Sequence, residues 1–206
     1  WKFSLSDQAD AKETNYDDSG WRNLDIPHDW SIEMEYDRES PVGRGGGYLP
    51  AGTGWYRRSL LLNEAESGRK HFIQFDGVMA NCDVWINGQH LGKRPYGYTS
   101  FAYELTGKLT FGGKKPNIIA VRVDNSNQPA SRWYAGAGIY RHVRLVSLNP
   151  VHFDRWGIFI TTPEVKSNKA KVNLEIKVYN QSLKDEQLSI QTTLISPEGK
   201  SVASAS

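Results

Sequence analysis

The chain has 206 residues, and its 25 Lys and Arg nearly balance its 23 Asp and Glu, which leaves a formal net charge of +2. The basic residues are scattered, which excludes the positive stripe typical of nucleic-acid-binding proteins. The apolar runs are short and interrupted by charges, which excludes a transmembrane helix, and the first residues, WKFSLSDQAD, lack a signal region. We therefore expect neither nucleic acid nor membrane as a partner.

The first third of the chain predicts two strands separated by irregular structure. A short strand is expected at 1–5, and Pro27 forces an extended residue before it, so a second extended stretch ends there. Residues 43–54 are too rich in glycine for regular structure and match neither the dinucleotide fingerprint nor the P-loop. We interpret them as a loop that leads into a strand at 55–62.

The clearest local signal is a hairpin at 82–92, where Asn87-Gly88 supplies the positive φ angles of a two-residue turn. Cys82 begins this hairpin; it is the only cysteine, so we expect a small buried hydrophobe and no intrachain disulfide. Further strands are expected at 71–75, 101–104, 117–123 and 139–148. Their spacing, with hardly any helical periodicity, predicts an antiparallel β-sandwich rather than an α/β fold.

After Leu148 the sequence changes in character. Asn149-Pro150 is a break, and three simpler strands are expected at 156–161, 171–179 and 187–195, the second with one buried and one wet face. They amount to about half of an immunoglobulin-like sandwich, which needs roughly 100 residues. We predict an all-β chain with domains at 1–148 and 149–206, the second incomplete, and hence a fragment of a longer protein.

Familiar catalytic templates are missing. There is no Gly-x-Ser-x-Gly elbow and no His-Glu-x-x-His, and the five histidines are scattered singly, so we expect no metal and no cofactor. Acidic residues do gather just after Trp30, and two carboxylates about 5 Å apart are what a retaining glycosidase needs. Their alternate positions favour one solvated edge instead; they are Glu33, Glu35, Asp37 and Glu39.

Two segments carry the candidate binding residues. Asp29 lies between His28 and Trp30, where it suits either an N-cap on the following turn or an acceptor for sugar hydroxyls beside a tryptophan platform. The local chemistry favours the cap. The second segment, 131–143, combines Gly136 and Gly138 with aromatic side chains of the kind that pack on sugars.

Within that second segment the residues leave two interpretations open. Arg132 and Trp133 suit either an arginine stacked on an aromatic ring or direct ligand contact. Arg141 suits either ligand contact or an ion pair with Asp124 or Asp154.

An ordered series of short motifs resembles the N-terminal sugar-binding domain of glycoside hydrolase family two. Any one motif is weak, but the series is specific, and it covers about 1–148; the remainder resembles the start of that family's immunoglobulin-like domain. The motifs are DDSGW at 17–21, IPHDW at 26–30, GWYRR at 54–58, FDGV at 75–78, VWING at 84–88, GYTSF at 97–101, VRVDN at 121–125 and SRWYAGAGIYRHV at 131–143.

The resemblance implies a jelly-roll sandwich, then an immunoglobulin-like sandwich, leading into a TIM barrel that carries the catalytic glutamates. Such a barrel needs about 250 residues of its own, so this chain alone is expected to be inactive, with no catalytic residue in it. The β-galactosidase group is the most similar, and β-glucuronidases and β-mannosidases share the plan. The implied partners are a terminal β-galactoside, the barrel of the same parent chain and further copies in a homo-oligomer.

For Asp29 the resemblance favours contact with the substrate over the capping role. In β-galactosidases the matching loops reach the rim of the barrel's pocket, which implies substrate contacts from Asp29, Trp30, Arg132 and Trp133. Well-known bacterial members have asparagine in place of Asp29 and an acidic residue near Arg132 that helps to hold a monovalent cation. Arg132 removes that acidity, which speaks against the cation.

Three functions are weighed. The first is a non-catalytic part that shapes the pocket of a retaining, bacterial β-galactosidase-like enzyme. The second is an autonomous carbohydrate-binding module, and the third is a purely structural scaffold, favoured if Asp29, Arg132 and Trp133 are buried and fully paired. We expect a periplasmic or secreted protein, with the cytoplasm as the open alternative.

Overall fold

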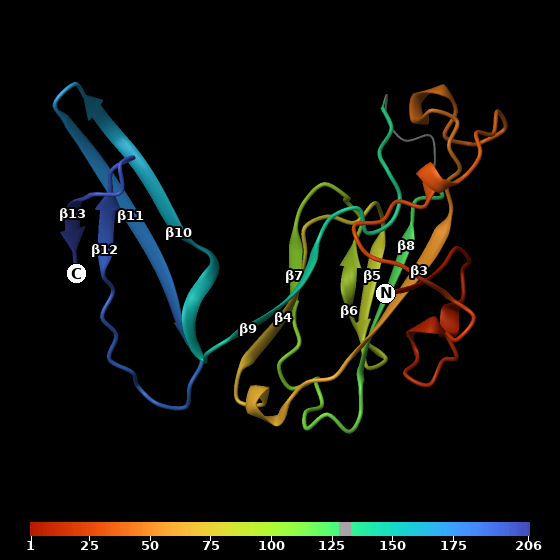
Figure 1. The fold of residues 1–206 in the computed structure, drawn as a ribbon, viewed down its shortest axis with the longest axis horizontal. Coiled ribbons are helices and arrows are strands. Elements are labelled where there is room, and N and C mark those ends of the chain that lie inside the picture. The colour runs from red at the N-terminus through yellow and green to blue at the C-terminus, as the bar shows by residue number, and fades with distance from the viewer. Residues whose placement is uncertain (128–132) are drawn as a thin grey trace. The chain divides into compact units, whose positions relative to one another are not determined.

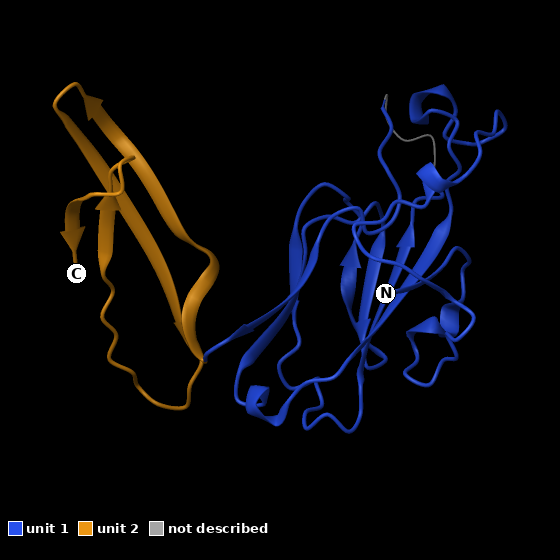
Figure 2. Cartoon of the chain, viewed as in Figure 1, with its two compact units in different colours: residues 1–149 blue, residues 150–206 orange. Residues whose placement is uncertain are grey.

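The computed structural model describes residues 1–127 and 133–206, which form two compact units (Figure 2). Unit 1 is Trp1–Asn149 and unit 2 is Pro150–Ser206. Regular structure is almost all strand, and the helical elements are 3-10 turns of three or four residues. Within the described ranges, no helix has the length and apolar character needed to cross a membrane.

Unit 1 is an antiparallel β-sandwich of two sheets (Figure 1). One sheet has six strands in the order β2-β1-β3-β8-β5-β6, and the other has three in the order β7-β4-β9. The elements of unit 1 are β1 (Lys2–Ser4), η1 (Ala9–Lys12), β2 (Arg22–Asn23), η2 (Ser31–Glu33), η3 (Arg44–Gly46), β3 (Thr53–Leu60), η4 (Glu64–Glu66), β4 (Lys70–Phe75), β5 (Cys82–Ile86), β6 (Gln89–Arg94), β7 (Phe101–Glu104), β8 (Asn117–Asp124) and β9 (Val143–Leu148).

The core of unit 1 lies between these two sheets. Alternate side chains of β8 and β5, such as Val121 and Val84, point inwards and meet Phe75 of β4 and Phe101 of β7, whose rings stack with centroids 4.9 Å apart. Each fully buried side chain of this size stabilises the fold by about 1.5–3 kcal/mol. Cys82 is fully buried among them, as expected of a small hydrophobe.

These observations confirm the predicted all-β class and the hairpin. β5 and β6 pair antiparallel around Asn87 and Gly88, whose φ angles are +50° and +80°. The expected strand at 139–148 begins four residues late, at Val143. Ile139 is completely buried in an irregular segment instead, because its carbonyl accepts the backbone N–H of His28 at 2.8 Å rather than pairing in a ladder.

Unit 2 holds two antiparallel two-stranded sheets, β10-β11 and β12-β13. The strand expected at 187–195 is shorter than predicted, and β13 was not predicted at all. An irregularity in β10 between Phe153 and Ile158 places Trp156 at a φ of +61°. The elements are β10 (Val151–Lys166), β11 (Lys169–Asn180), β12 (Thr192–Ile195) and β13 (Ser201–Ala205).

The predicted buried face of β11 is only partly covered within unit 2. Val172 and Leu174 keep 37% and 36% of their surface exposed. Together with Ile160 and Leu194 they line an apolar groove of about 480 Å³. The prediction of a buried face is confirmed only in part, because Ile176 and Val178 are half-buried while Val172 and Leu174 are exposed.

Candidate functional site

Three loops of unit 1 meet at one end of the sandwich. The loop at 27–30 is tied to the segment at 134–140 by the bond from the His28 N–H to the Ile139 carbonyl. The same segment exchanges two backbone hydrogen bonds with a third loop, between Met79 and Gly138, at 2.9 and 2.8 Å. Residues far apart in the sequence are therefore held side by side.

Asp29 is the polar centre of this meeting point. Its Oδ1 accepts the N–H groups of Ser31 at 3.0 Å and Ala137 at 3.1 Å. Its Oδ2 accepts the phenolic O–H of Tyr134 at 2.5 Å. Oδ1 is thus committed to the backbone, while Oδ2 holds one side-chain donor and, as a carboxylate oxygen, has a second lone pair that can accept another.

The bond to Ser31 closes a local turn directly before η2, but the N-cap of η2 is Trp30 and it makes no side-chain capping bond, so the N-cap role that the local sequence favoured for Asp29 was wrong. The bond to Ala137 is the part that no local pattern could reveal. Asp29 is half-buried and Tyr134 is 40% exposed, so the pair lies at the surface. Burial first, and then the hydrogen bond to Asp29, raise the pKa of Tyr134, which keeps this phenol a donor at neutral pH.

Glycine is required where the segment passes over Asp29. Gly136 and Gly138 have φ angles of +83° and +95°, which residues with a Cβ rarely adopt. A Cβ on Gly136 would lie 3.1 Å from Oδ2 of Asp29, and one on Gly138 would lie 2.2 Å from the Tyr56 hydroxyl. The predicted role of these glycines in shaping the segment follows directly from these close approaches.

A buried network supports the loop from beneath. His28 Nδ1 lies 2.7 Å from Tyr56 Oη, and its Nε2 lies 2.9 Å from Nη2 of Arg22. Arginine can only donate, so it makes Nε2 the acceptor and leaves Nδ1–H to donate to Tyr56. Burial lowers the pKa of His28 against the opposing influence of Glu33, so the imidazole is neutral at pH 7.

The predicted binding residues fall in different places. Asp29 is at the surface, and Trp133 is 56% exposed, directly before Tyr134. Trp30 is 1% exposed within the core, so it cannot present a sugar platform to solvent; its ring lies 5.8 Å from Phe3, centroid to centroid. Arg132 lies outside the described residues.

Sequence reasoning missed one residue of this region and left another open. Tyr134 lies in the aromatic segment at 131–143, but nothing in the sequence indicated it as a partner of Asp29. Arg141 does not pair with Asp124, which binds Arg122 instead; it is exposed, and its guanidinium lies 5.3 Å from the centre of the Tyr140 ring. The acidic residues from Glu33 to Glu39 are exposed as predicted, but the residues between them are exposed too, so the alternate spacing does not mark one edge.

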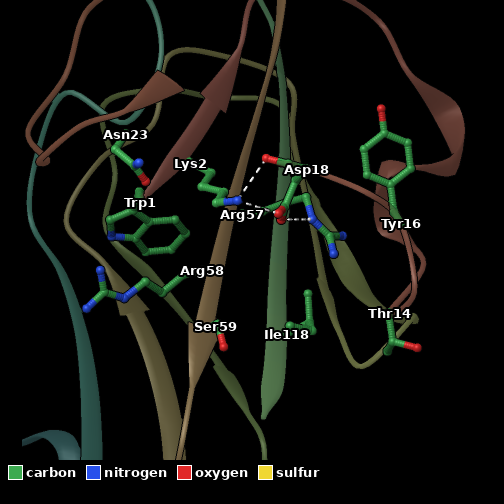
Figure 3. A pocket seen from close by; sticks show the side chains of 10 residues that line it. All are labelled: Trp1, Lys2, Thr14, Tyr16, Asp18, Asn23, Arg57, Arg58, Ser59 and Ile118. Atoms are coloured by element: carbon green, nitrogen blue, oxygen red, sulfur yellow. Dashed lines mark hydrogen bonds and ion pairs between the residues drawn. The ribbon is translucent and has the colours of Figure 1, made fainter. Parts of the chain in front are cut away.

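A hollow of about 420 Å³ lies elsewhere in unit 1, beside β1 and β3 (Figure 3). Lys2 and Arg57 both reach Asp18 there, at 2.8 Å each. Arg57 is 2% exposed and also donates to the carbonyls of Ala11 and Glu13. Because these donors hold the chain's own loop against the sheet, we assign the cluster a structural role.

No three side chains of the metal-binding types His, Cys, Asp and Glu gather in the described part of the chain. The arrangement around Asp29 can instead bind neutral hydroxyl groups, because one carboxylate oxygen and one phenol face the surface together.

Comparison with known proteins identifies the family of the chain. Residues 1–149 match the family model for the sugar binding domain of the glycosyl hydrolases of family 2. A β-galactosidase of Bacteroides ovatus, BoGH2A, is 46% identical over 203 residues, which are 98% of this chain and 24% of that protein. A putative β-glucuronidase of Formosa agariphila is 45% identical over 178 residues, 86% of this chain and 17% of that protein.

Solved structures of glycosidases are similar to this chain as well. The structure of a β-glycosidase from Bacteroides vulgatus superposes with a TM-score of 0.90 at 40% identity, covering 99% of this chain and 26% of that one. The chain thus spans about a sixth to a quarter of the length of these relatives. With the family model matching 149 of its 206 residues, the chain belongs to glycoside hydrolase family 2.

Proposed function

We propose that this chain is the non-catalytic, sugar-binding part of a retaining glycoside hydrolase and that Asp29 and Tyr134 hold hydroxyl groups of the terminal sugar. The observation that carries the proposal is the Asp29–Tyr134 pair at the surface, with Oδ2 free to accept a second hydrogen bond. Within the parent protein this pair completes the rim of a pocket whose acid/base and nucleophile carboxylates come from a TIM barrel.

The parent reaction that we propose is hydrolysis of terminal β-galactosides through a covalent glycosyl intermediate. The similarity to the Bacteroides ovatus β-galactosidase supports this choice. The nearly equal identity to a putative β-glucuronidase makes that activity the alternative for the parent.

The test uses the longer parent protein and two aryl substrates, 4-nitrophenyl β-D-galactoside and 4-nitrophenyl β-D-glucuronide. We expect kcat/KM to be higher for the galactoside, and the reverse order would select the glucuronidase alternative. Asp29→Ala should lower kcat/KM by about tenfold to a hundredfold, because a hydrogen bond to a charged group contributes about 1.5–3 kcal/mol.

Asp17→Ala is the matched control. Asp17 closes the same kind of turn as Asp29, accepting the N–H of Ser19 at 3.0 Å, but its carboxylate has no bond to the 134–140 segment. We expect its activity to equal that of the wild type. Wild-type activity in Asp29→Ala would rule out the proposed contact.

An autonomous carbohydrate-binding module is the second candidate, and the exposure of Trp133 favours it. Titration calorimetry of residues 1–206 with galactose and lactose separates the two. Feeble binding supports the pocket-rim function, and tight binding without the rest of the parent supports the module.

A further inference from the structure

Three large aromatic side chains are exposed next to the Asp29 site. Tyr96, Tyr98 and Trp133 keep 61%, 40% and 56% of their surface accessible. Tyr96 and Tyr98 lie after β6, and Trp133 lies in the segment that also carries Tyr134. The sequence singled out only Trp133, because nothing local indicates that the 96–98 loop meets it.

The three rings are fixed relative to one another. The indole Nε1–H of Trp133 donates to the hydroxyl of Tyr98 at 3.0 Å. The rings of Tyr96 and Tyr98 lie 5.5 Å apart, centroid to centroid, at an angle of 60°. Such contacts remove rotamer freedom before any ligand arrives, which lowers the entropic cost of binding.

The backbone beneath the rings explains why they point outwards. Gly97 is buried, and a Cβ there would lie 2.5 Å from Sδ of Met79. Its carbonyl accepts the hydroxyl of Tyr140 at 2.9 Å. The chain bends at 97–99 with Gly97 packed inwards, and Tyr96 and Tyr98 on either side of it are exposed.

This aromatic group adjoins the sugar site directly. Tyr134 bonds to Asp29, while Trp133, one residue earlier and about 3.8 Å away along the backbone, bonds to Tyr98. A ligand held by Asp29 can therefore continue onto the exposed rings.

We propose that Tyr96, Tyr98 and Trp133 form a stacking platform for a second pyranose ring, the one linked to the sugar at Asp29. The inference rests on the proposed function for the identity of the first sugar. An aromatic face takes up the C–H face of a pyranose, and Tyr98 Oη, which accepts from Trp133, keeps its own hydrogen for a sugar oxygen. The parent enzyme would then prefer oligosaccharides to simple galactosides.

The test compares two substrates of the parent protein. In β-galactosyl fluoride the leaving group has no ring, whereas in lactose it is a second pyranose. We expect Trp133→Ala and Tyr96→Ala each to lower the ratio of kcat/KM for lactose to kcat/KM for the fluoride by about tenfold, a loss of about 1.4 kcal/mol. Trp133→Phe, which keeps a ring, should recover part of the ratio.

Trp156→Ala is the matched control, because Trp156 is a still more exposed tryptophan in unit 2, and its ratio should equal that of the wild type. If Trp133→Ala and Tyr96→Ala leave the lactose-to-fluoride ratio of kcat/KM unchanged, the platform is overturned. Equal losses with both substrates also leave the ratio unchanged and count against it.

If the parent protein cleaves neither substrate, the proposed function fails but the platform is still untested. A binding measurement then tests the platform. In affinity electrophoresis through gels containing soluble β-1,4-galactan, wild-type protein should migrate more slowly than Trp133→Ala. Equal mobility would overturn the platform.

Discussion

The phenol of Tyr134 lies 2.5 Å from Oδ2 of Asp29, although 105 residues separate the two in the chain. The same carboxylate accepts the backbone N–H groups of Ser31 and Ala137, so one side chain joins two loops and still offers a free lone pair. Its role in joining the loops and its proposed role in binding are therefore compatible, because Oδ1 accepts the two backbone N–H groups while Oδ2 can accept from a ligand.

Removing the Tyr134 hydroxyl should weaken the site without unfolding it. Tyr134→Phe removes the side-chain donor that Oδ2 of Asp29 has among the described residues, and a hydrogen bond to a charged group contributes about 1.5–3 kcal/mol. In the parent protein we expect kcat/KM to fall by about tenfold, measured with 4-nitrophenyl β-D-galactoside. Tyr48→Phe, at a tyrosine of similar exposure outside the contacts of Asp29, serves as the control. Equal activities of the two variants would argue against the role of Tyr134.

The glycine at 138 should tolerate no side chain. Gly138→Ala adds a Cβ that would lie 2.2 Å from Tyr56 Oη and 3.0 Å from the carbonyl of His28. Gly107→Ala is the matched control, since Gly107 also has a positive φ, +77°, but has nothing within 4 Å of the added Cβ. The free energy of unfolding of the control should fall by about 1–2 kcal/mol, which is the cost of a positive φ for a residue with a Cβ.

Thermal unfolding of both variants measures the difference. We expect the melting temperature of Gly138→Ala to lie several degrees below that of Gly107→Ala, about 2–4 °C for each additional 1 kcal/mol of destabilisation. Matching melting temperatures would show that the loop yields to the new side chain.

The ion pair between Asp18 and Arg57 should make stability depend on acid pH. Burial acts to raise the pKa of Asp18, but hydrogen bonds from Lys2 and Arg57 outweigh it and hold that pKa below its ordinary value. A lowered pKa stabilises the fold above the unfolded pKa of about 3.9, and this contribution is lost as the pH falls through the folded pKa.

Asp18→Asn tests this at two pH values. At pH 7 we expect the variant to be less stable by about 2 kcal/mol, because Arg57 keeps only 2% of its surface exposed and loses its charged partner. The difference should shrink as the pH falls below about 4. Urea unfolding of wild type and variant gives both values, and a difference that does not depend on pH would contradict the assignment.

Cys82 should be unreactive in the native protein. It is fully buried, and burial raises the pKa of its thiol, so little thiolate is available to attack a reagent. With a thiol reagent such as 5,5′-dithiobis(2-nitrobenzoate), we expect one thiol per chain to react in denaturant and almost none without it. Rapid labelling of the native protein would show that unit 1 opens around β5.

The sequence predicted those parts of the fold that depend on local patterns. Asn87-Gly88 located the hairpin because its positive φ angles are a property of two adjacent residues. The start of β9 was misplaced because Ile139 has the composition of a strand residue, and only its bond to His28 removes it from the ladder.

The candidate site also divides into features set by adjacent residues and features set by contacts between distant ones. Consecutive residues predicted an N-cap at Asp29 and the structure shows a local turn to Ser31 instead, whereas the bonds of Asp29 to Tyr134 and Ala137 cross more than 100 positions. Trp30 was placed at the surface because sugars favour tryptophan, whereas its packing against Phe3 depends on how the loop folds back onto β1.

The most direct test of the sugar site is a crystal structure of the longer parent protein with a bound β-galactoside. The proposal predicts a ring hydroxyl of the terminal sugar within about 3 Å of Oδ2 of Asp29, with the Tyr134 phenol still in contact with that oxygen. A bound sugar whose hydroxyl groups all find other partners, with Asp29 bonded only to Ser31, Ala137 and Tyr134, would contradict it.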